Sequence, residues 1–256
     1  MAVLKLVLAY DGAGFRGFAR QPGQRTVQGV LEAALERVLG EAPKLSVAGR
    51  TDAGVHASGQ VVSFPADADP ARIQRSVNGM VAPEVVVRSA RRMPEGFDAR
   101  HSATARRYRY RIRTEDWPDP FSARFEWHRP GPLRIGRMRA AARELTGEHD
   151  FASFCRGGGG STVRTLRRLT VRRIGDVVEV GAEANAFLHQ MVRSLVGTLV
   201  AVGEDRLTPG SMAEVLAARS RAAAGPVAPP DGLELVAVRY GAIPHRRVRS
   251  RASGGQ

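Results

Sequence analysis

Cysteine, lysine and long apolar runs are scarce in this sequence. Cys155 is the single cysteine, so no disulfide forms within the chain, and no cysteine–histidine spacing predicts a metal site. The best candidate for a membrane span, 186–202, contains His189, Gln190 and Arg193, which favours a buried amphipathic helix. The first residues do not have the pattern of a signal peptide. We therefore expect a cytoplasmic protein with no membrane association and no bound metal.

Arginine is present in excess. The formal net charge is +14, and only Lys5 and Lys44 contribute lysine to the 39 basic residues. Guanidinium groups bind phosphates bidentately and stack on bases, so the excess indicates a polyanionic partner. A GC-rich genome also enriches arginine, and that bias accounts for part of the excess. Nine arginines from Arg88 to Arg113, against two acidic residues, form the strongest basic block.

Apolar periodicity predicts two α+β units and a tail. The first unit, 1–103, has expected strands at 3–9, 44–48, 60–64 and 84–90, and helices after Thr26 and at 70–79. The second, 104–243, has expected strands at 106–113, 163–173, 177–183 and 233–240, and helices at 134–146, 186–202 and 208–219. Residues 244–256 carry arginines without apolar anchors and are expected to be disordered. The pattern favours mostly antiparallel sheets with helices packed on one face.

A loop bracketed by glycines contains the first candidate site. Gly49 and Gly54 flank Arg50 and Asp52, and glycine lets a backbone turn sharply and approach a ligand. A carboxylate beside a guanidinium stays ionised, which suits a nucleophile or a base. A surface turn with a solvated ion pair fits the same spacing, and the nearby His56 is as compatible with a structural role.

The stretch 186–202 contains a single formal charge, Arg193. A guanidinium on a mostly buried helix is costly unless it is paired, so Asp52 is a candidate partner. The alternative is an arginine whose head reaches the surface while its stem stays buried.

The strand expected at 106–113 alternates aromatic and basic residues. Tyr108 and Tyr110 then share one face of the strand, and Arg109 and Arg111 share the other. An aromatic face is suited to stacking on a base and a basic face to contacting phosphate. Tyrosines of a buried strand core give the same pattern.

Together these motifs resemble the tRNA pseudouridine synthase A family over nearly the whole chain. The matching segments are GRTDAGVHA followed by GQV, YDGAGFRGF, TVQGVLEAAL, FDARHSATARRYRYRI, GEHDFASF and FLHQMVRSLVGTLVAVG. The resemblance implies that Asp52 is the catalytic aspartate and that Arg193 pairs with it. It also implies that Tyr108 is the active-site tyrosine and that Arg50 helps to displace the target base.

The resemblance implies an activity and an assembly as well. The activity is isomerisation of uridine to pseudouridine at positions 38–40 of the tRNA anticodon stem-loop, without a cofactor or metal. The expected fold has two α+β domains whose sheets join into one extended sheet, with a basic cleft between them. A homodimer that holds one tRNA across both subunits is expected; the sequence itself supports it only through the broad apolar surface of 186–202. The expected substrate-binding residues are Tyr108, Arg50, Arg109, Arg111 and His56.

Some positions depart from the family pattern. They are Phe18, Ala19, 81–83, His101 and the glycine run 157–160. None of them is a predicted catalytic residue, so they bear on the substrate rather than on the chemistry. A pseudouridine synthase acting on a different RNA is therefore one alternative, and a catalytically silent RNA-binding protein on the same fold is another.

Overall fold

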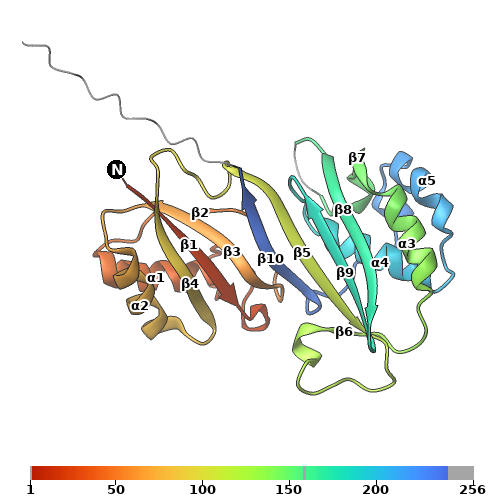
Figure 1. The fold of residues 1–256 in the computed structure, drawn as a ribbon, viewed down its shortest axis with the longest axis horizontal. Helices are drawn as coiled ribbons and strands as arrows, with labels where there is room; N and C mark the ends of the chain where they lie inside the picture. The colour runs from red at the N-terminus through yellow and green to blue at the C-terminus, as the bar shows by residue number, and fades with distance from the viewer. Residues whose placement is uncertain (1, 158–159, 242–256) are drawn as a thin grey trace, which may run out of the picture.

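The computed structural model describes residues 2–157 and 160–241, and the predicted tail 244–256 lies outside these ranges (Figure 1). The described chain is α+β. Its strands are β1 (Val3–Tyr10), β2 (Ser46–Val47), β3 (His56–Pro65), β4 (Val85–Met93), β5 (Ala103–Arg113), β6 (Trp127–His128), β7 (Gly147–Asp150), β8 (Val163–Ile174), β9 (Val177–Ala184) and β10 (Leu233–Tyr240). Its α-helices are α1 (Val27–Leu39), α2 (Pro70–Val81), α3 (Ile135–Glu144), α4 (Met191–Gly203) and α5 (Met212–Ala217).

All ten strands of the described chain belong to one mixed sheet. The main order is β4-β1-β3-β10-β5-β9-β8-β7, with β2 added on β3 and β6 on β5. Neighbours are antiparallel except in the pairs β10–β3 and β5–β6, which are parallel. The sheet therefore runs without interruption from the first predicted unit into the second (Figure 1). The domain boundary at 103/104 stays a prediction.

One face of the sheet is covered by helices. A row of side chains in register crosses six strands and lies in a single buried cluster: Tyr10, Ala57, Leu235, Tyr108, Ala182 and Leu169. Apolar residues of α1 to α5 join the same cluster. The helices thus pack on one side, α1 and α2 at one end of the sheet and α3 to α5 at the other (Figure 1).

Two predicted helices differ from the observed ones. The helix expected at 186–202 begins only at Met191, because Gln190 has a left-handed backbone with φ of 58°. Phe187 and Leu188 nevertheless pack against the core from the preceding loop, so they continue the apolar pattern without being helical. The helix expected at 208–219 is reduced to the short α5, which follows a single 3-10 turn at Pro209–Ser211.

In the middle of the sheet, β3 and β10 pair at two positions only. These are Glu234 with His56 and Leu235 with Ala57. Farther along, β2 occupies the edge of β3. The backbones cross closely at Gly59, where a Cβ would lie 2.3 Å from the carbonyl oxygen of Val236. The two halves of the sheet are therefore joined by a short parallel contact and a close backbone approach.

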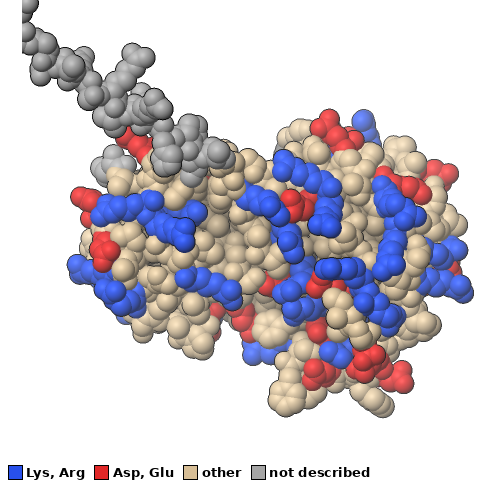
Figure 2. Space-filling view, viewed as in Figure 1, with Lys and Arg blue, Asp and Glu red and all other residues tan. Residues whose placement is uncertain are grey.

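Charge is unevenly distributed over the molecular surface. Basic side chains spread across the uncovered face of the sheet, and acidic ones gather around the 114–126 connection at the lower end of the view (Figure 2). None of the helices in 2–157 and 160–241 combines the length and apolarity that a membrane span requires.

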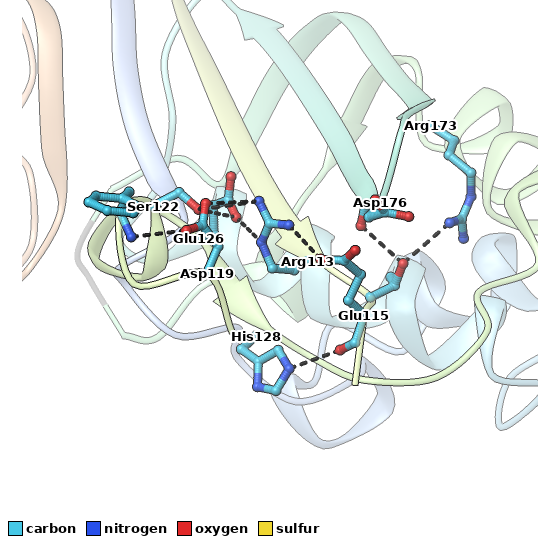
Figure 3. Close-up of polar contacts among 10 residues, drawn as sticks. Arg113, Glu115, Asp119, Ser122, Glu126, His128, Arg173 and Asp176 are labelled. Atoms are coloured by element: carbon cyan, nitrogen blue, oxygen red, sulfur yellow. Dashed lines mark hydrogen bonds and ion pairs between the residues drawn. The ribbon is translucent and has the colours of Figure 1, made fainter. Parts of the chain in front are cut away.

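Arg113, at the end of β5, binds side chains at both ends of the 114–126 connection (Figure 3). The guanidinium of Arg113 lies 2.7 Å from Glu126 and 2.8 Å from Glu115. Ser122 adds a hydrogen bond to Asp119 at 2.9 Å. Both ends of the connection therefore bind one partly buried guanidinium.

Replacing Gly59 by alanine tests the close crossing of β3 and β10. The added methyl meets a backbone oxygen that cannot swing away, so we expect the free energy of unfolding to fall by about 1–3 kcal/mol. Gly79 in α2 is the control, because nothing lies within 4 Å of a Cβ there. Gly79→Ala should raise the free energy of unfolding by about 0.5–1 kcal/mol. Urea denaturation measures the free energy of unfolding of both variants. Equal changes in the two variants would contradict the close approach of β3 and β10 at Gly59.

Candidate active site

Asp52 lies on the connection between β2 and β3, in a tight turn that its own carbonyl closes. The amide of Val55 donates to the carbonyl oxygen of Asp52 at 3.2 Å. Gly54 has φ of +79°, and a Cβ on it would come within 2.8 Å of Pro230, so glycine is required there. Gly49 has no such constraint, since its Cβ would make an ordinary 3.8 Å contact with the Tyr108 hydroxyl. Only one of the two bracketing glycines is therefore dictated by geometry.

A buried polar chain supports this loop from beneath. Gln60 donates through Nε2 to the carbonyl oxygen of Gly49 at 2.7 Å and to the hydroxyl of Tyr10 at 3.3 Å. Tyr10 and Thr51 share a hydrogen bond of 2.8 Å between their hydroxyls. Burial raises the pKa of Tyr10 to about 12, so its hydroxyl keeps its proton. Sequence reasoning missed this series of hydrogen-bonded side chains, which holds the backbone on both sides of Arg50.

Arg193, near the start of α4, reaches Asp52. Its Nη1 lies 3.4 Å from Oδ2 of Asp52, and its Nε donates to the carbonyl oxygen of Ala228 at 2.7 Å. The side chains of Arg193 and Asp52 are 14% and 26% exposed, so the pair is only partly screened by water. The carboxylate of Asp52 thus has a positively charged partner at the cavity.

Tyr108 projects from β5 toward the same loop. Its ring packs edge-on against Phe187, with 5.2 Å between centroids. Burial raises the pKa of Tyr108 well above its usual range, and the nearby Tyr10 and Asp52 raise it further. The side chain therefore stays a neutral phenol.

His189 also lies beside Asp52, with its Nε2 3.7 Å from Oδ1. Its other ring nitrogen, Nδ1, is 2.8 Å from the carbonyl oxygen of Arg156. Sequence reasoning did not single out this residue, because it placed 186–202 on one helix. The observed loop before α4 turns His189 toward the carboxylate instead.

These residues line a cavity of about 1010 Å³. Phe187 and His189 line the cavity from the loop before α4. Asp52 lines it from the 48–55 connection, and Tyr108 from β5. The basic residues of its lining are Lys44, Arg50, Arg100, Arg106, Arg164 and Arg193, against the acidic Asp52 and Asp98. A cavity with this lining is suited to a ligand that has both an apolar ring and phosphate groups.

The other predicted substrate-binding residues separate into two groups. Arg50 is exposed at the cavity, and no residue of the described chain pairs with its guanidinium. Arg109 and Arg111 project from the opposite face of β5, and Arg109 is bound to Glu234 at 2.6 Å. The structure does not bring these two arginines to Asp52.

His56 is buried outside the cavity. Its Nδ1 accepts a hydrogen bond from the amide of Gly12 at 3.0 Å, and its ring contacts Phe125 at 4.8 Å between centroids. Burial lowers the pKa of His56, although the Asp11 carboxylate opposes the shift. The neutral ring thus joins three segments of the backbone and does not face Asp52.

Known proteins resemble this chain along most of its length. A family model described as tRNA pseudouridine synthase matches residues 6–102 and 141–241. The tRNA pseudouridine synthase A of Frankia casuarinae is 50% identical over 255 residues, covering 96% of this chain and 92% of the relative. That of Geobacter sulfurreducens is 42% identical over 245 residues, covering 94% and 100%. A solved structure described as a Cbf5-Nop10-Gar1 complex aligns with a TM-score of 0.36 and 14% identity, covering 77% of this chain and 45% of that chain.

The chain belongs to the tRNA pseudouridine synthase family. Its similar relatives bear the name tRNA pseudouridine synthase A, which confirms the resemblance seen in the sequence.

Substituting Arg193 tests its pairing with Asp52. Leucine fits the apolar surroundings of α4, but it leaves the carboxylate without its partner, so we expect kcat to fall about 100-fold or more. Lysine should restore only part of the rate, because a point charge does not reproduce the planar guanidinium. Arg206→Leu is the control, since Arg206 is exposed and pairs with Glu204 on the surface. Near-normal turnover of a folded Arg193→Leu protein would contradict the assignment.

Proposed function

We propose that the chain isomerises uridine to pseudouridine at positions 38–40 of the tRNA anticodon stem-loop, with Asp52 as its catalytic carboxylate. The supporting observation is that Asp52, Arg193 and Tyr108 come from three distant parts of the sequence and meet in one basic cavity. The family supplies the reaction. The geometry supplies a carboxylate, a cation paired with it and an aromatic ring beside both.

The reaction breaks the N1–C1′ bond, rotates the uracil and forms a C5–C1′ bond. Asp52 attacks the sugar or base, or removes a sugar proton, because its carboxylate lines the cavity beside Arg193 and Tyr108. Arg193 holds the carboxylate in place. Tyr108 stacks on the uracil while its hydroxyl remains protonated. Since substrate and product are isomers, no cosubstrate is consumed.

A stem uridine must leave its helix before Asp52 can reach it. Arg50 is suited to occupying the space that the base leaves, since it is exposed, unpaired in the described chain and only two residues from Asp52. We include base flipping in the proposal on this ground. The basic lining of the cavity forms the proposed cleft for the phosphates around the target.

A homodimer belongs to the proposal, but not through the surface that the sequence suggested. Every residue of α4 except Arg193 is buried within the chain, so its apolar face is not available to a second copy. The 114–126 connection instead exposes Trp117 and Phe121, at 82% and 93%. It also carries the acidic side chains held by Arg113.

An acidic, aromatic connection is complementary to a basic surface. On this chain such a surface lies on the same side as the connection, along the uncovered face of the sheet (Figure 2). Two patches that complement each other on one side of a molecule allow a two-fold contact, in which each copy contributes both. We therefore place the proposed dimer contact at Trp117 and Phe121.

Replacing Asp52 by asparagine is the test of the activity. The change keeps the size of the side chain and removes the charge and the reactive oxygen, so turnover should be abolished while tRNA binding changes little. Pseudouridine formation is followed by tritium release from tRNA labelled at C5, together with a binding titration. A silent RNA-binding protein would show no activity before or after the change. Turnover within a few-fold of the wild type would refute catalysis by Asp52.

A double substitution tests the dimer contact. Trp117→Ser with Phe121→Ser removes the exposed aromatic area, and light scattering at micromolar concentration should then give the 27.6 kDa monomer instead of a dimer. Val163→Ser is the control, because Val163 is an exposed apolar residue at the far end of β8. A wild-type chain that is monomeric and fully active would remove the dimer from the proposal.

A further inference from the structure

The tautomer of the neutral His189 ring follows from its contacts. A carbonyl oxygen only accepts hydrogen bonds, so Nδ1 of His189 must donate its proton to the oxygen of Arg156, 2.8 Å away. In the neutral ring Nε2 is then unprotonated. This nitrogen faces Asp52, with 3.7 Å to Oδ1. The structure thus places a proton acceptor of fixed tautomer beside the catalytic carboxylate.

The backbone holds the ring in this orientation. The amide of Arg156 donates to the carbonyl oxygen of His189 at 3.2 Å, so the two residues are joined by a main-chain and a side-chain contact. Gln190 then turns the chain sharply into α4. The side chain of His189 is 54% exposed, which gives Nε2 a route for exchanging protons with water.

The proposed reaction needs such an acceptor at its end. Once C5 is bonded to C1′, it still carries its original hydrogen. The C5=C6 double bond of the uracil ring forms again only when that proton leaves. The raised pKa of Tyr108 makes its phenol a poor acceptor. Arg50 and Arg193 are donors only. Asp98, at another part of the cavity lining, already accepts the amides of Arg100 and His101 at 2.8 Å.

We propose that His189 is a further catalytic residue, whose Nε2 removes the C5 proton in the last step; the inference rests on the proposed function. The C5–H electron pair forms the C5=C6 double bond, the former N1=C6 pair moves to N1, and N1 takes up a proton. The proton on Nε2 passes to water, and neutral His189 is restored. Hydrogen is conserved, since one leaves C5 and one joins N1.

The test measures turnover of tRNA carrying deuterium at C5 of its uridines. For His189→Ala, kcat should fall about 10²–10⁴-fold, the usual contribution of general base catalysis. A primary deuterium isotope effect on kcat should appear in this variant, because proton loss from C5 becomes rate-limiting. Added imidazole should restore part of the rate. Binding of tRNA should remain close to that of the wild type.

A second variant separates catalysis from positioning. His189→Gln retains an amide that can still donate to the Arg156 carbonyl, but it has no nitrogen that accepts a proton. It should be as slow as His189→Ala; restored turnover would show that His189 only positions the loop and would overturn the proposal. His149→Ala, at a partly exposed histidine on β7, is the control for general effects.

Three further outcomes decide the matter. A His189→Ala rate within a few-fold of the wild type overturns the proposal, as does a large loss without an isotope effect. An isotope effect in Tyr108→Phe but not in His189→Ala assigns the proton to the tyrosine instead. Each of these leaves catalysis by Asp52 untouched, whereas a fully active Asp52→Asn enzyme removes the proposed function itself.

Discussion

Arg106 donates hydrogen bonds to four backbone carbonyls that come from separate segments of the chain. The acceptors are Ala48, Arg100, Ala103 and Asn185, at 2.7–3.2 Å. No carboxylate of the described chain pairs with this buried guanidinium, so its charge is stabilised by carbonyl dipoles alone. The acceptors lie after β2, in the turn before β5, at the first residue of β5 and after β9. One side chain therefore holds together backbone segments that no strand pairing joins at these points.

The cavity holds its ionisable groups in different environments. Asp52 has a guanidinium nitrogen of Arg193 at 3.4 Å. Tyr108 is kept neutral by burial. One ring nitrogen of the half-exposed His189 contacts the carbonyl oxygen of Arg156, and the other faces Asp52 at 3.7 Å. A neutral phenol beside a carboxylate and an imidazole supplies hydrogen-bond donors and acceptors in one cavity.

Local patterns in the sequence predicted most strands and the loop of Asp52, because alternation and glycine spacing act over a few residues. The last strand, 233–240, was predicted with its observed limits. His189 was missed because Phe187 and Leu188 continue the helical spacing while they lie in a loop. Arg106 was missed for a different reason. Its acceptors are carbonyls spread over more than a hundred residues, and backbone oxygens leave no trace in a sequence.

The alternation of β5 also limits what its basic residues do. Tyr108 faces the cavity, and Arg109 and Arg111 face the other side of the sheet, because successive side chains of a strand point in opposite directions. One uridine cannot contact both faces. Any phosphate bound by Arg111 therefore belongs to a stretch of RNA outside the cavity, while Arg109 is already engaged by Glu234. β5 contributes Tyr108 to the cavity but directs Arg109 and Arg111 to the other face of the sheet. The arginine that contacts Asp52, Arg193, therefore comes from another segment of the chain.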